Sequence, residues 1–290
     1  MRLLSDNSYD IRQTIVVCGS ARSGTTWLAQ TLQSVPGSAV LFEPLNLRRV
    51  ARARRCGFRP RTYVRPGTDW PEGELLLGDI LRGRLLTPWT VQEIRRFARV
   101  QTWIVKFIEA NRMLPWLTER FPVRAPVLLV RHPCAVVASQ VAAAWTGDVE
   151  LHDADLETDF PAVKHVLDAV ETPIEHRAAR WAIDTLVPLS APGPQRWTTL
   201  FYEDLVRNEE TLDPLFDRWN IPKPLAVGAH LRKISSTADR RGTGHDPLTD
   251  WTRRLATDEV RRVLDVTHAL GLDFYGEDPE PDRTRLRLMP

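Results

Sequence analysis

Five short apolar runs are spaced along the chain, and each is followed by glycine or by charged and polar residues. The runs are four to six residues long and rich in β-branched and bulky side chains, which is typical of strands. Most of them lack the polar alternation of a half-exposed strand, so they predict strands buried on both faces of a sheet. The predicted strands are Thr14 to Cys18, Ala39 to Phe42, Thr102 to Phe107, Pro126 to Val130 and Trp197 to Phe201.

Segments with apolar residues at helical spacing lie between these runs. Thr25 to Leu32 follows the first run and places Trp27, Leu28 and Leu32 on one side of a helix, and Cys134 to Ala144 predicts a helix after the fourth run. Strands that alternate with helices predict an α/β fold with a parallel central sheet flanked by helices. Ligands of such sheets bind at the carboxyl ends of the strands, so the polar residues found there are the first candidates for a site.

The length of the chain, 290 residues with 43% hydrophobic residues, allows a substantial core. We predict a single domain over residues 1–290, with a core of about 14–275 and insertions of about 46–100 and 145–175. The first insertion contains the arginine-rich segment Arg48 to Arg65, and the second begins with the acidic run Asp148 to Asp159. We interpret the acidic run as a solvated surface segment.

The net charge is only +2, so the molecule as a whole is not a binder of polyanions. Cys18, Cys56 and Cys134 are scattered and form neither a metal-binding spacing nor a disulfide framework. No apolar stretch approaches the ~20 residues of a membrane span, and the segment from Met1 to Gln13 has no apolar signal core. We therefore predict a cytoplasmic protein without a membrane span.

The first predicted strand leads into a glycine-containing loop and then into a helix. Gly19 and Gly24 allow a tight path, and the exposed N–H groups and dipole of a helix start favour an anion. Thr25 and Thr26 add hydroxyl donors. The glycine spacing fits a P-loop, but Thr25 stands where the usual lysine follows the second glycine, and Arg22 is the only cation of the loop. The pattern predicts a site for a phosphate ester that is poorly suited to a kinase.

The segment from Gly19 to Trp27, GSARSGTTW, resembles the 5′-phosphosulfate loop of sulfotransferases that use 3′-phosphoadenosine 5′-phosphosulfate (PAPS) and release PAP. The resemblance implies a P-loop NTPase-like sulfotransferase fold, a 5′-phosphate held by loop amides and hydroxyls, and Arg22 near the bridging oxygen of the leaving group. Arginine at this position is similar to carbohydrate-type and bacterial members more than to cytosolic aryl members. The donor-binding residues that it implies here are Ala21, Arg22, Ser23, Gly24, Thr25, Thr26 and Trp27.

A second segment, Leu129 to Ser139, resembles the family's 3′-phosphate motif, in which an arginine ends a strand and a serine follows eight residues later on a helix. Arg131 and Ser139 match this spacing. A guanidinium presents a fork of donors that suits phosphate, and a helical hydroxyl adds one more. His132 stands where many relatives have Asp, and we expect this difference to affect loop packing more than phosphate binding.

Two looser matches complete the predicted donor site. Phe201 to Leu205, FYEDL, resembles a family segment whose aromatic residue, here Tyr202, lies near the nucleotide, although packing at a helix start would explain Tyr202 equally well. Arg240-Arg241-Gly242 resembles the glycine-bearing loop that closes over the 3′-phosphate. The sequence does not decide which of the two arginines points inward.

The chemistry that the resemblance implies is an in-line sulfuryl transfer that requires no metal and depends on positioning and electrostatics. Arg22 would offset charge on the leaving phosphate, and Lys106 is a second candidate for this role. The acceptor hydroxyl needs a base. The histidine that aryl relatives carry after the equivalent of Lys106 is absent, whereas Glu43-Pro44 resembles a Glu-Pro pair of carbohydrate-type relatives, so Glu43 is the first candidate and Glu109 the second. The alternative for Glu43 is a salt bridge that orders its loop.

Two other functions stay open at this point. A P-loop small-molecule kinase would use ATP with Mg²⁺, but the loop lacks its lysine. A non-catalytic nucleic-acid binder would use Arg48 to Arg65, but these arginines lack interleaved aromatic residues, so we expect the segment to meet an anionic acceptor or to lie idle on the surface. The acceptor, whether sugar, glycolipid or secondary metabolite, is selected by the insertions, where Trp70, Trp89 and Trp145 are candidates to line its pocket.

Overall fold

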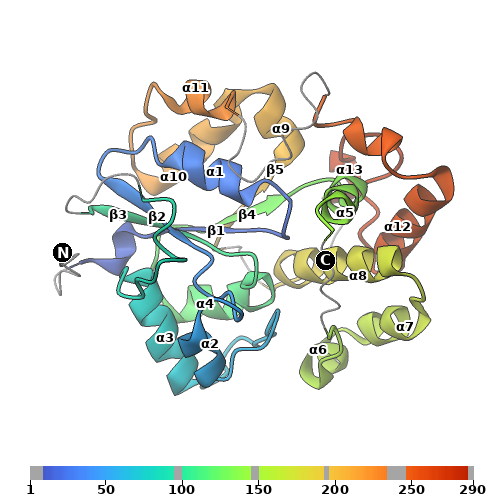
Figure 1. Cartoon of the computed structure of the whole chain (residues 1–290), viewed down its shortest axis with the longest axis horizontal. Helices are drawn as coiled ribbons and strands as arrows, with labels where there is room; N and C mark the ends of the chain where they lie inside the picture. Colours follow the sequence, from blue (N-terminus) through green and yellow to red (C-terminus); the bar gives the residue numbers. More distant parts are fainter. Residues whose placement is uncertain (1–8, 95–99, 145–149, 193–195, 234–245, 287–290) are drawn as a thin grey trace.

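A five-stranded parallel sheet forms the centre of the protein (Figure 1). The computed structural model describes residues 9–94, 100–144, 150–192, 196–233 and 246–286. The strand order is β2-β3-β1-β4-β5, so the first strand lies in the middle, between β3 and β4. The strands are β1 (Ile15–Cys18), β2 (Ser38–Phe42), β3 (Thr102–Lys106), β4 (Val127–Val130) and β5 (Thr198–Phe201).

The five strands predicted from the apolar runs are confirmed, with ends that differ by one residue at most. β1, β3 and β4 are buried along their whole length. Both faces of these strands contact the core, and their sequences therefore lack polar alternation. The predicted α/β class, a parallel sheet flanked by helices, is confirmed as well.

Two layers of helices cover the sheet. On one face, Ile15 and Val17 of β1 pack with the buried side of α1 (Thr25–Leu32), α10 (Asp213–Trp219) and α11 (Val227–Leu231). On the other face, Val16 and Cys18 pack with α3 (Pro71–Leu81), α4 (Leu114–Arg120) and α8 (Pro173–Leu189). A smaller apolar cluster joins α5 (Pro133–Ala142) to α12 (Thr257–Ala269). The remaining helices and 3₁₀ turns are α2 (Ala51–Arg55), α6 (Ala154–Asp159), α7 (Pro161–Ala169), α9 (Tyr202–Arg207), α13 (Arg283–Leu286), η1 (Ile11–Gln13), η2 (Asn111–Met113), η3 (Glu209–Leu212) and η4 (Asp250–Arg253).

The position of a ligand site follows from this topology. The chain leaves β1 through a glycine loop, residues 19–24, into α1 on one face, and it leaves β4 into α5, which packs against α8 on the other face. Neighbouring strands whose connections diverge in this way open a crevice at their carboxyl ends. Within the described residues, no helix has the length and apolar character of a membrane span.

The two predicted insertions contact each other in the structure. Arg65 of the arginine-rich segment forms ion pairs with Asp155 at 2.7 Å and with Asp159 at 2.6 Å, and the Tyr63 hydroxyl donates to Asp159 at 2.7 Å. Leu156 of the same acidic run is fully buried. In its described part the acidic run lies mostly at the surface, in agreement with the interpretation from the sequence, but Leu156 packs inward and two carboxylates of α6 bind the first insertion.

Candidate functional site

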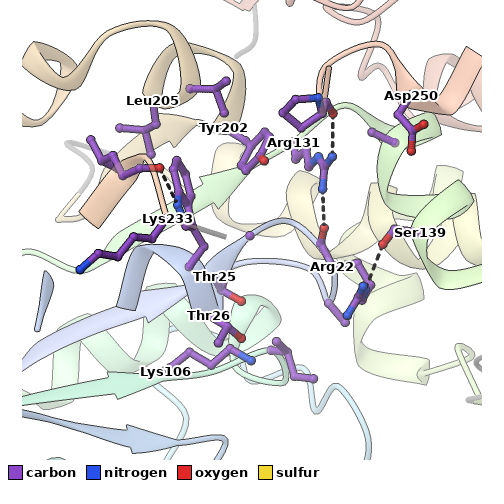
Figure 2. A pocket seen from close by; sticks show the side chains of 18 of the residues that line it. Arg22, Thr25, Thr26, Lys106, Arg131, Ser139, Tyr202, Leu205, Lys233 and Asp250 are labelled. Atoms are coloured by element: carbon purple, nitrogen blue, oxygen red, sulfur yellow. Dashed lines mark hydrogen bonds between the residues drawn. The ribbon is translucent and has the colours of Figure 1, made fainter. Parts of the chain in front are cut away.

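A cavity of about 920 Å³ opens at the carboxyl edge of the sheet, between the glycine loop, β3 and the loop after β4 (Figure 2). Most of the residues proposed from the sequence line it. These are Ala21, Arg22, Gly24, Thr25, Thr26, Trp27, Glu43, Lys106, Arg131, Ser139 and Tyr202. Ser23 is buried beside the cavity without lining it. Arg240, Arg241 and Gly242, together with Trp145, lie outside the described residues.

The glycine loop reaches the cavity through two left-handed residues, Arg22 with φ 76° and Gly24 with φ 94°. Gly24 is the N-cap of α1, so the first N–H groups of that helix have no intrahelical acceptor. A Cβ atom at Gly24 would lie 2.8 Å from the ring of Tyr202, and one at Gly19 would lie 2.6 Å from the carbonyl oxygen of Leu129. Both glycines are therefore needed for close packing as well as for the path of the loop.

Arg22 and Arg131, proposed for two different phosphates, lie next to each other. Arg22 Nε donates to Ser139 Oγ at 3.0 Å, and Arg131 Nη1 donates to the carbonyl oxygen of Arg22 at 3.2 Å. Arg131 also donates to Pro247 at 2.9 Å, and its guanidinium lies 4.3 Å from the ring centroid of Tyr202. Among the described residues, its buried Nε has no hydrogen-bond partner. The two predicted phosphate regions thus form one continuous basic surface.

Lys106 ends β3 with its side chain almost completely buried, and its ammonium donates to Glu43 Oε1. Burial lowers the pKa of Lys106, and the Glu43 carboxylate acts in the opposite direction. The ammonium also lies 4.6 Å from the ring centroid of Phe42. Removing one member of such a pair leaves the other charge uncompensated. Glu43 therefore forms a salt bridge, which was the alternative to its role as a base. Its partner is Lys106, the second candidate for stabilising charge on the leaving phosphate.

The backbone around Glu43 is held in an unusual conformation. Glu43 has φ 39°, its N–H donates to the carbonyl oxygen of Lys106 at 3.0 Å, and its own carbonyl accepts from Trp89 Nε1 at 3.2 Å. Trp89 lines the cavity and packs edge-on against Phe42, whereas Trp70 packs against Phe58 and does not line it. The candidate base thus lies beside an aromatic wall.

Glu109, the second candidate base, has a different environment. Its Oε2 accepts from the backbone N–H of Arg61 at 3.3 Å, and it is not among the residues that line the cavity. The geometry favours Glu43 over Glu109 for contact with a bound acceptor.

The charge of the cavity is strongly positive. Of the described residues, seven arginines and lysines line it against three carboxylates, and the basic set is Arg22, Lys106, Arg131, Arg207, Arg232, Lys233 and Arg254. Such a surface attracts a polyanionic ligand and holds it at several points. No group of three or more His, Cys, Asp or Glu side chains that could hold a metal ion is found in the described parts of the chain.

A model of the sulfotransferase family matches residues 14–222, which is most of the chain. The chain belongs to the sulfotransferase family. The match begins one residue before β1 and extends past α10, so it covers both loops that line the basic part of the cavity of this sulfotransferase. No curated protein sequence matches the chain.

Several solved sulfotransferase structures are similar to this chain at low identity. The sulfotransferase domain from the curacin biosynthetic pathway is 18% identical, with a TM-score of 0.43 and 95% of both chains covered. The sulfotransferase domain from the Synechococcus PCC 7002 olefin synthase is 17% identical, with a TM-score of 0.47 and coverage of 91% of this chain and 97% of that one. Mouse sulfotransferase SULT7A1 complexed with PAP is 14% identical, with a TM-score of 0.46 and coverage of 92% and 87%.

Three residues that contact the site of this sulfotransferase were not predicted from the sequence. Asp184 accepts from Ser20 Oγ at 2.9 Å, and Gln140 donates to the carbonyl oxygen of Ala21 at 3.0 Å. Trp181 donates to the carbonyl oxygen of Arg131 at 3.0 Å. The one signal in the sequence is that Gln140 and Asp184 interrupt the buried faces of α5 and α8.

His132 stabilises the turn that carries Arg131. Its Nδ1 accepts from the backbone N–H of Cys134 at 3.2 Å and caps α5, and its Nε2 lies 3.0 Å from the carbonyl oxygen of Gly276. The ring is 1% exposed and stacks on Trp251. Nδ1 as acceptor and Nε2 as donor require the neutral imidazole, and burial lowers the pKa of His132 to about 4. His132 therefore acts in the packing of the loop.

We expect the free energy of unfolding to fall as the pH decreases from about 6.5 to about 4. In this window the unfolded chain protonates His132 and the folded protein does not, so acid favours the unfolded state by up to about 3 kcal/mol. Urea unfolding between pH 4 and pH 7, compared for the wild type and His132→Asn, measures the effect.

The asparagine can still accept a hydrogen bond from the Cys134 N–H and does not titrate. The free energy of unfolding of the variant should therefore depend much less on pH. Burial raises the pKa of Glu203, so protonation of Glu203 makes the free energy of unfolding rise as the pH falls. This contribution is common to both proteins and cancels in the comparison. Equal slopes in the two proteins would contradict the role assigned to His132.

Proposed function

We propose that this sulfotransferase binds PAPS and transfers its sulfuryl group to a hydroxyl of an acceptor, releasing PAP and a sulfate ester. The observation that carries the proposal is one cavity lined by the N-terminus of α1 and Lys106 at one end and by Arg131 and Ser139 at the other, with Arg22 in contact with the last two. A donor with phosphate groups at both its 5′ and 3′ ends matches a site with two adjacent basic regions.

The residues of the cavity fit this donor. The free N–H groups of α1 and the hydroxyls of Thr25 and Thr26 suit a 5′-phosphate, and the left-handed path at Gly24 leaves them open because no side chain intervenes. Arg131, whose Nε has no hydrogen-bond partner within the described residues, suits a 3′-phosphate, with Ser139 as a second donor. Tyr202 lies beside both regions, 5.2 Å from Trp27 between ring centroids.

When bound, the donor supplies an activated sulfuryl group, and the residues of the chain position and polarise it. Arg22 and Lys106 offset the negative charge that develops on the leaving phosphate and on the sulfonate oxygens. Glu43 accepts the proton of the acceptor hydroxyl while the acceptor oxygen forms its bond to sulfur and the bond from sulfur to the bridging phosphate oxygen breaks. Lys106 holds the Glu43 carboxylate within the cavity.

The acceptor would approach from the side of Glu43. There the cavity is lined by Phe42, Trp89 and Ile108, a set of side chains that suits the apolar face of a sugar or of a ring in a glycolipid or secondary metabolite. The cytoplasmic location and the absence of a nucleic-acid partner stay predictions from the sequence.

The choice of nucleotide is the first test. PAP should raise the melting temperature of the purified protein, because a ligand that binds only the folded state stabilises it by mass action. ATP with Mg²⁺ at the same concentration should have a much smaller effect. Thermal denaturation measures both, and equal stabilisation by the two nucleotides, or stabilisation by ATP alone, would overturn the proposal in favour of a kinase.

Arg131→Ala tests the 3′-phosphate region. The variant should bind PAP far more weakly, by an amount of order 2–5 kcal/mol for a desolvated charged partner. Its affinity for adenosine 5′-phosphosulfate, which lacks the 3′-phosphate, should change little, and Ser139→Ala should act in the same direction more mildly. Calorimetric titration of both ligands measures the difference, and parallel losses would show that Arg131 serves the fold instead.

Glu43→Gln tests the base. Removal of a general base lowers the rate by about 10²–10⁴-fold, so kcat with an acceptor found by screening should fall by this factor while PAP affinity is retained. Glu43→Asp should recover part of the rate because it keeps a carboxylate set back by one methylene. Transfer from labelled PAPS, read by mass gain of the acceptor, measures kcat.

Glu109→Gln is the matched control for Glu43→Gln, since Glu109 lies near Lys106 in the sequence and outside the cavity. It should retain most of the activity. If Glu109→Gln is the inactive variant, the base assignment is wrong. If Glu43→Gln loses PAP binding or unfolds, the carboxylate is needed only as the partner of buried Lys106.

A further inference from the structure

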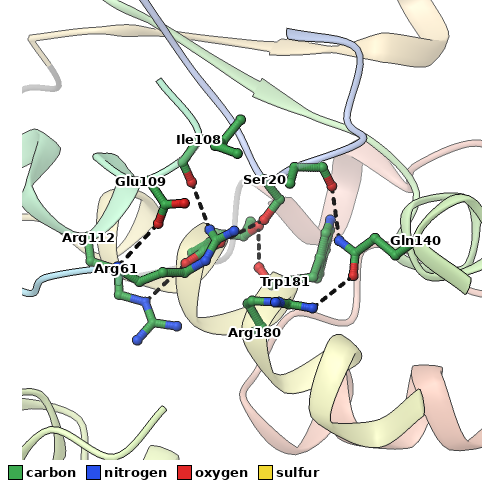
Figure 3. A network of polar contacts seen from close by, with 11 residues as sticks. Ser20, Arg61, Ile108, Glu109, Arg112, Gln140, Arg180 and Trp181 are labelled. Carbon is green, nitrogen blue, oxygen red and sulfur yellow. Dashed lines mark hydrogen bonds and ion pairs between the residues drawn. The ribbon is translucent and has the colours of Figure 1, made fainter. Parts of the chain in front are cut away.

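A buried polar network lies directly beneath the glycine loop (Figure 3). We call it the arginine cluster and define it as Arg61, Arg112, Arg180, Asp184 and Gln140. It joins the first insertion, η2, α5 and α8 to the loop. None of its members lines the cavity, so it supports the site from below.

Asp184 is the centre of the cluster. Its Oδ2 accepts from Ser20 Oγ at 2.9 Å and also from Arg61 Nη1, and its Oδ1 accepts from Arg112 Nε at 3.0 Å. One carboxylate therefore binds the glycine loop and two arginines from other parts of the chain at the same time.

Gln140 forms a second connection to the loop. Its Nε2 donates to the carbonyl oxygen of Ala21 at 3.0 Å, and its Oε1 accepts from Arg180 Nη2 at 3.1 Å. Ser20 and Ala21 are thus held by side chains immediately before Arg22, the left-handed residue that points into the cavity.

The cluster contains more positive than negative charge. Arg61, Arg112 and Arg180 are each at most 6% exposed. Within the described residues, Asp184 is the one fully buried carboxylate among them, and the half-buried Glu109 adds a second negative charge beside Arg61. Burial, followed by the charge of Arg61, lowers the pKa of Arg180 to about 10, so Arg180 stays protonated at neutral pH. Among the described residues, Arg112 Nη2 and Arg180 Nε have no hydrogen-bond partner. Buried charge without compensation is costly, and an anion bound nearby would reduce that cost.

We propose that the arginine cluster is a positioning element of the donor site, which holds the glycine loop in its anion-binding conformation and adds positive potential beneath the bound phosphates. The loop has no lysine after its second glycine, and the cluster supplies from below part of the charge that this lysine supplies in other P-loops. The identity of the bound anion rests on the proposed function, whereas the support of the loop does not.

The proposal also gives the arginine-rich segment a role. Arg61 is 5% exposed in a left-handed conformation, with φ 59°, and its guanidinium contacts both Asp184 and the carbonyl oxygen of Ile108, a residue that lines the cavity. Because Ser20 and Arg61 share one carboxylate oxygen, the arginine-rich segment and the glycine loop are coupled through a single atom.

Arg180→Met is the main test, since Arg180 reaches the loop through Gln140 and, within the described residues, forms no hydrogen bond with Asp184. We expect PAP to bind more weakly by on the order of tenfold, the effect of one charge acting through a partly polar interior. Adenosine, which carries no phosphate, should bind as it does to the wild type. Calorimetric titration of both ligands separates an electrostatic contribution from a general loss of structure, which would weaken both.

Three further variants complete the experiment. Arg180→Lys keeps the charge and should recover most of the PAP affinity. Gln140→Glu keeps a partner for Arg180 but removes the donor to Ala21 and adds a negative charge, so it should weaken PAP at least as much as Arg180→Met. Arg124→Met removes a partly buried arginine bound to Trp219 and Gln13 at the opposite edge of the sheet, and it should leave PAP affinity unchanged.

PAP affinity within twofold of wild type in folded Arg180→Met and Gln140→Glu would overturn the proposal, as would parallel losses for PAP and adenosine. If Arg180→Met does not fold, Gln140→Glu and Arg180→Lys decide the question alone. A wild-type protein that binds no PAP would instead refute the proposed function, and inorganic pyrophosphate would then serve as the probe for the same comparison.

Discussion

The parallel pairing of β1 with β3 and β4 is the constraint on which the site depends. Because the three strands run in one direction, the glycine loop, Lys106 and Arg131 all emerge at the same edge of the sheet. Val17 lies opposite both Lys106 and Val127 in the two registers, so a shift of either neighbour by one residue would turn Lys106 or Arg131 to the opposite face. The positions of the cavity's charged side chains are thus set by the backbone pairing of the strands.

Among the helices, α8 also positions the site. Arg180, Trp181 and Asp184 lie on neighbouring turns of this helix, and they reach, directly or through Gln140, both the glycine loop and the loop after β4. A capping box formed by Thr172 and Glu175 defines where α8 begins. One well-terminated helix therefore aligns the two loops that carry the basic side chains.

The parts of this molecule that could be predicted from its sequence are those encoded by local patterns. Apolar runs located the five strands that the structure describes, and the spacing of Gly19, Gly24, Arg131 and Ser139 located the loops, because these signals depend on residues close together in the chain. Lys106 and Glu43 were both selected, and a salt bridge was one of two alternatives for Glu43. Its partner could not be predicted, since the pairing with Lys106 depends on the register between β2 and β3.

The arginine cluster could not be predicted for the same reason. Its arginine residues come from an insertion, a 3₁₀ turn and a long helix, and nothing local distinguishes buried Arg61 from the exposed Arg59 two residues earlier. The pairing of Arg65 with α6 likewise joins segments about ninety residues apart. Long-range polar contacts follow from the tertiary fold, which single-sequence patterns do not contain.

The shared carboxylate of Asp184 restricts how this protein can diversify. In many α/β enzymes, surface insertions are exchanged between relatives while the central sheet stays the same, because such segments are only loosely attached. Here a replacement of residues 48–65 that omitted Arg61 would remove one of the two arginines that bind Asp184 and would disturb the contact of that carboxylate with Ser20. New acceptor preferences should therefore arise more readily through changes around Trp89, where the cavity wall is independent of Asp184, than through wholesale exchange of the arginine-rich segment.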